Sequence, residues 1–221
     1  RPPPALPAPP PAAAPWGARD RLVLSTLASI AHKILLPELA ALQAACADAM
    51  LDVRCSDALA DFDRDVDVAI RFGPGGWHGL QSRFLGDERL FPVASPDYCR
   101  MSAPVGEDAL ARHTLIHHPE SSWRLWVDPA RADPARSGNG LYIDDSALAL
   151  EAAAQGHGIA LARERLVPGD LRSGRLVRLF ERSVPAEYGY WAVWSASSPK
   201  RPMIETFIER AAILFTGENL S

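Results

Sequence analysis

Apolar positions along this chain follow two spacings, one typical of buried strands and one typical of amphipathic helices. After a first apolar strand, helical spacing predicts a helix from Ser29 to about Ala45, and Pro37 inside it should kink or split the helix. A short helix or turn is expected at 57–63. Strands that alternate with helices in this way favour a parallel α/β sheet. The strands predicted in this half are Leu22 to Leu27, Leu51 to Cys55 and Val66 to Arg71.

The most informative stretch lies in the second half of the chain. A short strand, Leu141 to Ile143, runs into Asp144-Asp145-Ser146, which caps an Ala/Leu-rich helix that stops at Gly156 or Gly158. A strand from Gly158 to Leu161 follows, so the pattern predicts a parallel βαβ unit. A helix N-terminus at the end of a parallel strand offers free N–H groups and partial positive charge to a small anion. The stretch therefore indicates a ligand site.

The remaining pattern predicts further strands, two shorter helical segments and a long amphipathic helix at the end, which must pack on a sheet. The strands are Gln81 to Leu85, Arg89 to Ala94, Thr114 to His117 and Tyr188 to Trp194, and the helical or Trp-rich segments are 107–112, Ser122 to Val127 and about Pro199 to Thr216.

Composition narrows the class of protein. The 221 residues are enough for one large domain or two small lobes. The net charge of -4 does not suggest that this chain itself binds DNA, because a DNA-binding surface needs Lys and Arg side chains to neutralise the phosphates. No stretch is apolar for long enough to predict a membrane span. Three cysteines without metal spacing (Cys46, Cys55 and Cys99) favour free thiols in a reducing cytoplasm.

Residues 1–15 hold eight prolines and favour polyproline II, which is typical of a semi-rigid linker. We interpret 1–19 as a linker to something upstream, and the alternative is a remnant of expression or truncation. No signal peptide is visible, although the chain starts with Arg.

Catalytic and metal chemistry are not indicated. His117-His118 looks like a metal pair but lacks suitable partners, and helix capping explains Asp144-Asp145. Gly156-x-Gly158 ends a helix rather than opening one, so it is no dinucleotide fingerprint. No Gly-x-Ser-x-Gly elbow supports hydrolysis. We therefore expect no enzyme, no cofactor and no metal.

In its order of motifs, the chain from about Arg21 to Phe215 resembles the effector-binding domain of LysR-type transcriptional regulators. Within that family it is most similar to the subgroup of the glycine-cleavage activator and the β-lactamase regulator. The stretches that carry the resemblance are Leu35 to Leu39, Val66 to Gly73, Trp77 to Leu80, Phe91 to Pro96, Asp144 to Ser146 with Ala154 to Gly156 and Gly158 to Leu161, and Asp170-Leu171 with Ser173 to Val177.

The resemblance implies a two-lobed α/β fold like that of periplasmic solute-binding proteins, joined by two crossing strands. Lobe one would be 20–95 plus 196–221 and lobe two 96–195, with hinges near Ser95-Pro96 and Ser195. The family's winged helix-turn-helix would lie upstream of Arg1, so DNA would be reached only through it, and no membrane partner is expected.

The resemblance also implies a homodimer or homotetramer. The helices at about 29–45 and 146–156 would pack against each other across subunits. A small-molecule effector (a carboxylate, amino acid or peptide-like compound) would sit between the lobes.

Ser29 and Ser146 each have two interpretations. Each either caps a helix or uses its hydroxyl and nearby N–H groups to hold an effector carboxylate. The resemblance favours the second, since the family places an effector-contacting Ser or Thr there. The two serines would then face each other across the cleft, one from each lobe.

Four more residues are weighed in the same way. Asp61 is either a solvated turn residue or, by resemblance, a contact for an effector amine or amide. Tyr190 either packs in the hydrophobic core or, by resemblance, reaches the pocket with its hydroxyl. Trp77 and His78 are either loop residues or walls of the ligand site, because their loop should border the cleft.

The sequence therefore predicts a cytoplasmic ligand-sensing domain of a LysR-type regulator. One rival is a secreted solute receptor of the same fold, which would need an export signal upstream. The other is an enzyme on this scaffold, which would need a nucleophile–base pair or a metal constellation that the sequence does not present.

Overall fold

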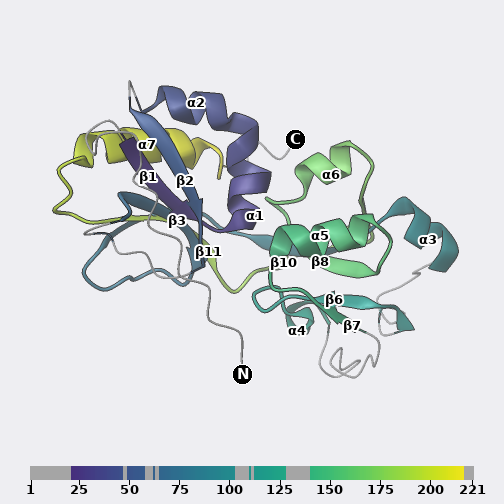
Figure 1. Cartoon of the computed structure of the whole chain (residues 1–221). Coiled ribbons are helices and arrows are strands. Elements are labelled where there is room, and N and C mark those ends of the chain that lie inside the picture. The colour runs from purple at the N-terminus through teal and green to yellow at the C-terminus, as the bar shows by residue number, and fades with distance from the viewer. Residues whose placement is uncertain are drawn as a thin grey trace, which may run out of the picture.

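The computed structural model describes residues 21–46, 49–57, 62, 65–102, 110, 112–127 and 140–216. It is an α/β protein with two mixed sheets, each with its own helices, at opposite ends of an elongated molecule (Figure 1). The predicted linker at 1–19 lies outside the described residues. So do most of the helix predicted at 107–112 and most of the helix or turn predicted at 57–63.

The first sheet has the strand order β2-β1-β3-β11-β4. Its first three strands are parallel, as the alternation of strands and helices predicted, and β11 is antiparallel to both β3 and β4. The strands are β1 (Arg21–Thr26), β2 (Met50–Cys55), β3 (Val68–Gly73), β4 (Gln81–Gly86) and β11 (Gly189–Trp194).

A helical run after β1 changes type along its length, as Pro37 predicted. The backbone is π-helical before the proline and 3-10 helical around it, because proline has no N–H for an ordinary helical hydrogen bond. The run comprises α1 (Ala28–Ile30), η1 (Ala31–Leu35), η2 (Leu36–Glu38) and α2 (Leu39–Ala44). The last helix, α7 (Arg201–Ile213), lies beside α2 over the sheet (Figure 1).

The second sheet has the strand order β10-β5-β8-β6-β7, and β9 also pairs with β5. Strand β6 is parallel to β7 and to β8, and α5 joins β7 to β8, so the predicted parallel βαβ unit is confirmed with β6 between its two strands. The strands are β5 (Arg89–Ala94), β6 (Leu115–His117), β7 (Gly140–Tyr142), β8 (Ile159–Arg163), β9 (Val177–Arg178) and β10 (Val184–Pro185). The helices are α3 (Pro96–Ser102), α4 (Trp123–Trp126), α5 (Ser146–Ala154) and α6 (Pro168–Arg172).

The described chain crosses between the sheets after β4 and again before β11. The crossovers lie side by side, since the backbone N–H of Ala186 donates to the backbone oxygen of Glu88 at 2.9 Å. The sequence placed the hinges one strand later, at Ser95-Pro96 and Ser195. A Ser-Pro break marks where a strand ends, but long-range pairing decides which sheet the strand joins, and here β5 joins the second sheet and β11 the first. We therefore propose that the lobes meet at 87–88 and 186–188.

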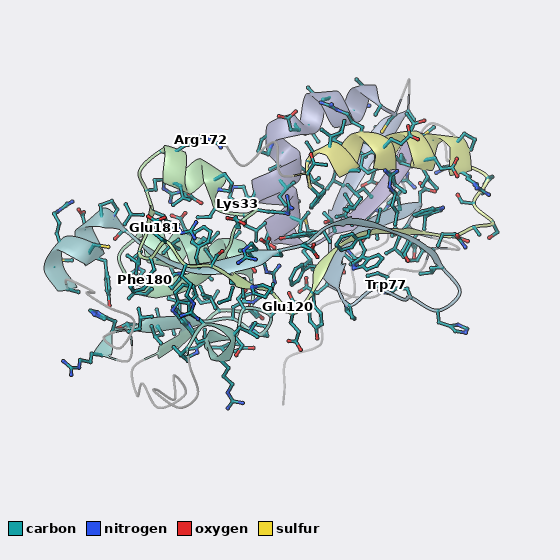
Figure 2. The ribbon with its side chains drawn as sticks, turned by 180° about the vertical axis from the view of Figure 1, so that it is seen from behind. Lys33, Trp77, Glu120, Arg172, Phe180 and Glu181 are labelled. Carbon is teal, nitrogen blue, oxygen red and sulfur yellow. The ribbon has the colours of Figure 1, made fainter. Side chains whose placement is uncertain are left out.

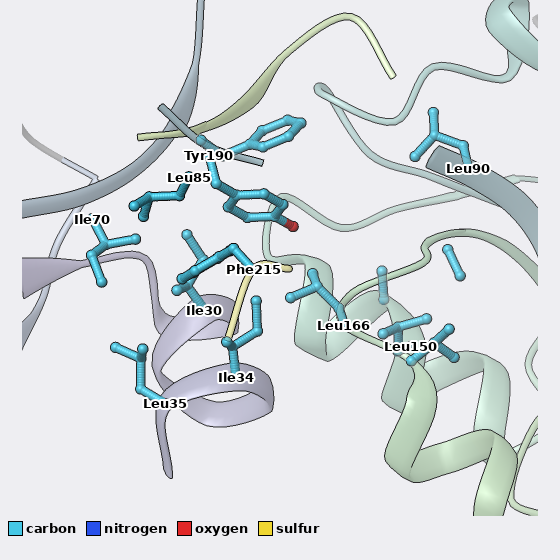
Figure 3. Close-up of a cluster of buried hydrophobic side chains, with 14 of the residues drawn as sticks. Ile30, Ile34, Leu35, Ile70, Leu85, Leu90, Leu150, Leu166, Tyr190 and Phe215 are labelled. Carbon is cyan, nitrogen blue, oxygen red and sulfur yellow. The ribbon is translucent and has the colours of Figure 1, made fainter. Parts of the chain in front are cut away.

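The two halves are packed against each other by one hydrophobic cluster. Side chains of the first half, such as Ile30, Tyr190 and Phe215, meet Leu150 and Leu166 of the second (Figure 3). The helical run after β1 also contacts α5. This packing brings the first turn of α1 and the first turn of α5 to opposite sides of one junction.

Candidate functional site

A polar cleft of about 270 Å³ lies at this junction. It is bordered by the carboxyl ends of parallel strands and by the first turns of α1 and α5, the position where ligands bind in open α/β sheets. Its polar lining comes from both halves: Ser29, Asp57 and Arg71 from the first, and His118, Glu120, Asp144, Asp145 and Ser146 from the second. Figure 2 labels Glu120 near the meeting of the two halves.

Ser29 and Ser146 line this cleft from opposite halves, and both are buried. Neither is the N-cap of its helix. The N-cap of α1 is Leu27, whose side chain caps nothing, and Ser29 is the second helical residue. The N-cap of α5 is Asp145, whose carboxylate accepts a hydrogen bond from the backbone N–H of Leu148 at 2.8 Å. Capping therefore accounts for Asp145, as predicted, and not for the two serine hydroxyls.

The Ser146 hydroxyl is held by a buried histidine. Its Oγ lies 3.0 Å from Nε2 of His118, and Nδ1 of the same ring accepts a hydrogen bond from the backbone N–H of Glu120 at 3.1 Å. Burial, and secondarily the charge of Arg163, lower the pKa of His118 to about 4, so the ring is neutral at neutral pH. From the sequence, His118 was noted only as one member of the His117-His118 pair, which lacked partners for a metal site.

Arg71 on β3 supplies a cation on the first-sheet side of the cleft. Its Nη2 donates a hydrogen bond to Ser25 Oγ at 2.7 Å. This bond helps to hold the guanidinium beside the cleft that it lines. Burial lowers the pKa of Arg71 and the charge of Asp57 raises it, and a guanidinium stays protonated in either case. Sequence reasoning assigned Arg71 no role, although a charge inside an otherwise apolar strand was a usable signal.

Carboxylates dominate the rest of the cleft. Glu120 accepts from Nη2 of Arg163 at 2.5 Å, and the buried Arg163 guanidinium lies 3.8 Å over the ring of Phe72. Asp144 makes no ion pair within the described part of the chain. The described lining of the cleft therefore presents one cation, Arg71, together with acidic groups from both halves, which suits a ligand that carries both charges.

Three of the other predicted site residues, Trp77, His78 and Tyr190, do not line this cleft. Trp77 is half-buried and stacks edge-to-face on Trp191, with ring centroids 6.2 Å apart, and His78 is exposed on the same loop. Tyr190 is fully buried, and its hydroxyl donates to Glu88 at 2.6 Å. Asp61 lies outside the described residues.

Across the described ranges, no group of three or more His, Cys, Asp or Glu side chains has a geometry that would hold a metal ion. Among the same residues, no helix has the length and apolar character needed to cross a membrane.

Comparisons with known proteins agree with the fold. Residues 17–213 match the family model of the LysR substrate binding domain. The glycine cleavage system transcriptional activator of Escherichia coli K12 is 32% identical over 198 residues, which are 86% of this chain but only 63% of that protein.

Two solved structures are similar in fold. The effector domain of the transcriptional regulator AmpR of Pseudomonas aeruginosa aligns with a TM-score of 0.74 at 28% identity, over 88% of this chain and 97% of that chain. The AmpR effector-binding domain from Citrobacter freundii aligns with a TM-score of 0.76 at 24% identity, over 88% of this chain and 98% of that one.

These relatives are named as transcriptional regulators and not as enzymes, in agreement with the expectation of a binding domain. The matched residues cover nearly all of the chain that carries the resemblance noted in the sequence. The chain therefore belongs to the LysR substrate-binding domain family, and its two-sheet α/β architecture is the fold of that family's effector-binding domains.

Proposed function

We propose that this chain is the effector-sensing domain of a LysR-type transcriptional regulator, and that a small anionic or zwitterionic effector binds in the cleft between the two sheets. The observation that carries the proposal is the convergence of Ser29 and Ser146 on one cleft from opposite halves of the molecule. DNA would be contacted by a separate domain upstream, and the regulator would work in the cytoplasm. The three free cysteines agree with that compartment.

The groups that line the cleft suit an effector carboxylate and an effector ammonium. The Arg71 guanidinium and the serine hydroxyls are donors, and charge-assisted hydrogen bonds to a carboxylate are among the stronger ones in proteins. Asp144 and Glu120 are acceptors for an ammonium group. An amino acid or a short peptide would use both sets.

Coupling to transcription would follow from contacts on both halves. An effector that binds more tightly to one lobe arrangement shifts the population toward it, by no more than its difference in affinity. That shift would change how subunits pack. Exposed leucines support the subunit contact that we expect between the first helical run and α5, since Leu36 is 53% and Leu148 60% exposed.

A secreted solute receptor is less well supported. It shares the fold, but the named relatives at about one-third identity are transcriptional activators. An enzyme would need a reactive constellation. Ser146 and His118 are within hydrogen-bond distance, but Nδ1 of His118 accepts a backbone N–H, so Nε2 carries the ring hydrogen and cannot act as a base toward the serine.

A thermal-shift screen tests the proposal. The chain is screened against amino acids, aromatic carboxylates and murein peptides, beside Ser29→Ala and Ser146→Ala. A matched control, Ser82→Ala, removes the same hydroxyl from an exposed position on β4 outside the cleft. At 100 times its dissociation constant a ligand adds about 2.7 kcal/mol of stability. We expect the ligand to raise the melting temperature of the parent and of the control, and to raise it less in both cleft variants. A shift that neither cleft variant reduces would place the ligand elsewhere.

A further inference from the structure

Building on the proposed function, we infer that His118 is a positioning residue that fixes the Ser146 hydroxyl as a hydrogen-bond donor to the cleft. The effector group bound at this point is therefore an acceptor, of carboxylate type. The inference rests on the contacts of one imidazole ring and on the place of Ser146 in its helix.

The contacts of His118 determine which ring nitrogen carries the hydrogen. Nδ1 accepts the backbone N–H of Glu120 at 3.1 Å, so Nδ1 itself has no hydrogen. A neutral imidazole has one N–H, which must then be on Nε2. The backbone carbonyl of Asp144 also stabilises a ring N–H. Since Ser146 Oγ lies 3.0 Å from Nε2, the histidine donates and the serine oxygen accepts.

The charges around the ring agree with a neutral histidine. Arg163 faces it with a positive charge that opposes protonation, whereas Asp144 and Asp145 favour it, and burial outweighs both carboxylates. A protonated ring would turn Nδ1 into a donor directed at the Glu120 N–H. The neutral form is the one that satisfies both hydrogen bonds.

Ser146 must then donate its own hydrogen elsewhere. It is the first residue of α5, and a helix N-terminus presents backbone N–H groups rather than carbonyl oxygens. One lone pair of its oxygen accepts from His118, and its own hydrogen has no acceptor among the described residues, so the hydroxyl offers that hydrogen to the cleft. The positive end of α5 and the Arg71 cation across the cleft favour a negatively charged acceptor, whereas the charges of Asp57, Asp144 and Asp145 in the same lining oppose it, and Glu120 is already paired with Arg163. An ammonium group cannot accept the hydrogen that the hydroxyl offers, whereas a carboxylate can.

The tautomer can be measured without an effector. Long-range proton–nitrogen NMR separates the two tautomers of each of the six histidines, and the signal lost in His118→Gln identifies His118. We expect the Nε2–H form at pH 7. A Nδ1–H form would overturn the inference and leave the proposed ligand-binding role of the cleft intact.

Two small probes test the direction of hydrogen bonding at Ser146. Acetate and methylammonium are similar in size, but acetate only accepts and methylammonium only donates. We expect acetate to shift the His118 ring and Ser146 amide signals, with an affinity that falls about tenfold in Ser146→Ala and in His118→Ala. The conservative His118→Gln, which keeps a side-chain N–H, should bind acetate within threefold of the parent.

The outcomes separate the two proposals. Perturbation by methylammonium in place of acetate overturns the donor assignment while the cleft remains a ligand site. A loss of acetate binding in His118→Gln as large as in His118→Ala overturns the positioning role. If neither probe shifts the His118 and Ser146 signals, the carboxylate assignment is contradicted. If, in addition, no compound in the thermal-shift screen stabilises the chain, the proposed function is contradicted as well.

Discussion

The phenolic oxygen of Tyr190 lies 2.6 Å from Oε2 of Glu88, at the place where the described chain crosses twice between its two sheets. Glu88 is on the first crossover, and Tyr190 is the second residue of β11, immediately after the other. The other carboxylate oxygen accepts the backbone N–H of Arg89 at 2.8 Å. The two crossovers are thus joined by a buried polar contact as well as by apolar packing (Figure 3).

Glu88 should make the stability of the protein depend on pH. Burial raises the pKa of Glu88 to about 7, although the hydrogen bond from Tyr190 and nearby arginines oppose the rise. Because the folded pKa exceeds the unfolded one, this contribution is fully present below about pH 4.5 and is lost as pH rises through about 7. We expect Glu88→Gln to remove that loss, which is on the order of 2 kcal/mol.

Urea unfolding of the parent and Glu88→Gln between pH 5 and pH 8 measures this difference. His118 acts in the opposite sense, since its lowered pKa costs stability as pH falls below its unfolded value of 6.5. His118 is present in both proteins, so its effect cancels in the comparison. Parallel stability curves for the two proteins would contradict the prediction.

Tyr190→Phe should affect stability and not ligand affinity. Removal of the hydroxyl leaves a buried carboxylate oxygen of Glu88 without this donor, which costs about 1–3 kcal/mol. The ring is fully buried between Phe72 and Phe215 and is not part of the cleft lining. Chemical denaturation and ligand titration of the same variant separate the two effects. Unchanged stability with a tenfold loss of affinity would support the pocket role that the sequence suggested for Tyr190.

The sequence predicted features that depend on local pattern. Helical spacing and Pro37 located the interrupted first helical run, and the motif from Leu141 to Leu161 located the βαβ unit. The resemblance assigned Ser29 and Ser146 to one site, and the structure brings both to one cleft. Each of these depends on residues near one another in the chain or on a motif order shared with a family.

Features that depend on distant pairing could not be predicted. The Glu88–Tyr190 contact spans 102 positions, and sheet membership of β5 and β11 depends on equally distant partners. His118 became a candidate only when its ring was found 3.0 Å from Ser146, 28 positions away. A lone histidine has no local signature that distinguishes a site from a satisfied side chain, whereas the charge of Arg71 inside an apolar strand was a local signal of a site.

Lys33 and Asp170 join the two halves through an ion pair of 2.7 Å, and both side chains are largely buried. Lys33→Met should destabilise the protein by about 1–2 kcal/mol, less than a fully buried pair would cost because Arg175 still neutralises Asp170. Arg201→Met is the matched control, since it breaks an exposed pair with Glu205 and should cost at most about 1 kcal/mol. Thermal and urea unfolding measure the loss of stability in each of the two variants. Equal costs would show that the interlobe pair adds nothing beyond a surface pair.

Arg71→Gln should weaken binding of a carboxylate effector much more than it changes stability. The guanidinium lies on the cleft, and a hydrogen bond to a charged group contributes about 1.5–3 kcal/mol, so affinity should fall roughly tenfold to a hundredfold. Stability should change little, because burial already disfavours the charge and the glutamine amide can still donate toward Ser25. The control is Arg54→Gln, which removes an equal charge from β2 in a pair with Asp52 outside the cleft.

Calorimetric titration with the ligand found in the screen, at two salt concentrations, distinguishes the role of Arg71 from a general charge effect. Loss of affinity in Arg71→Gln alone, at both salt concentrations, indicates direct contact with the effector carboxylate. Equal and salt-dependent losses in both variants would instead indicate long-range attraction, since exposed charges are screened over about 10 Å at 0.1 M salt. In that case the hydroxyls of Ser29 and Ser146 would have to hold the carboxylate without a cation in contact.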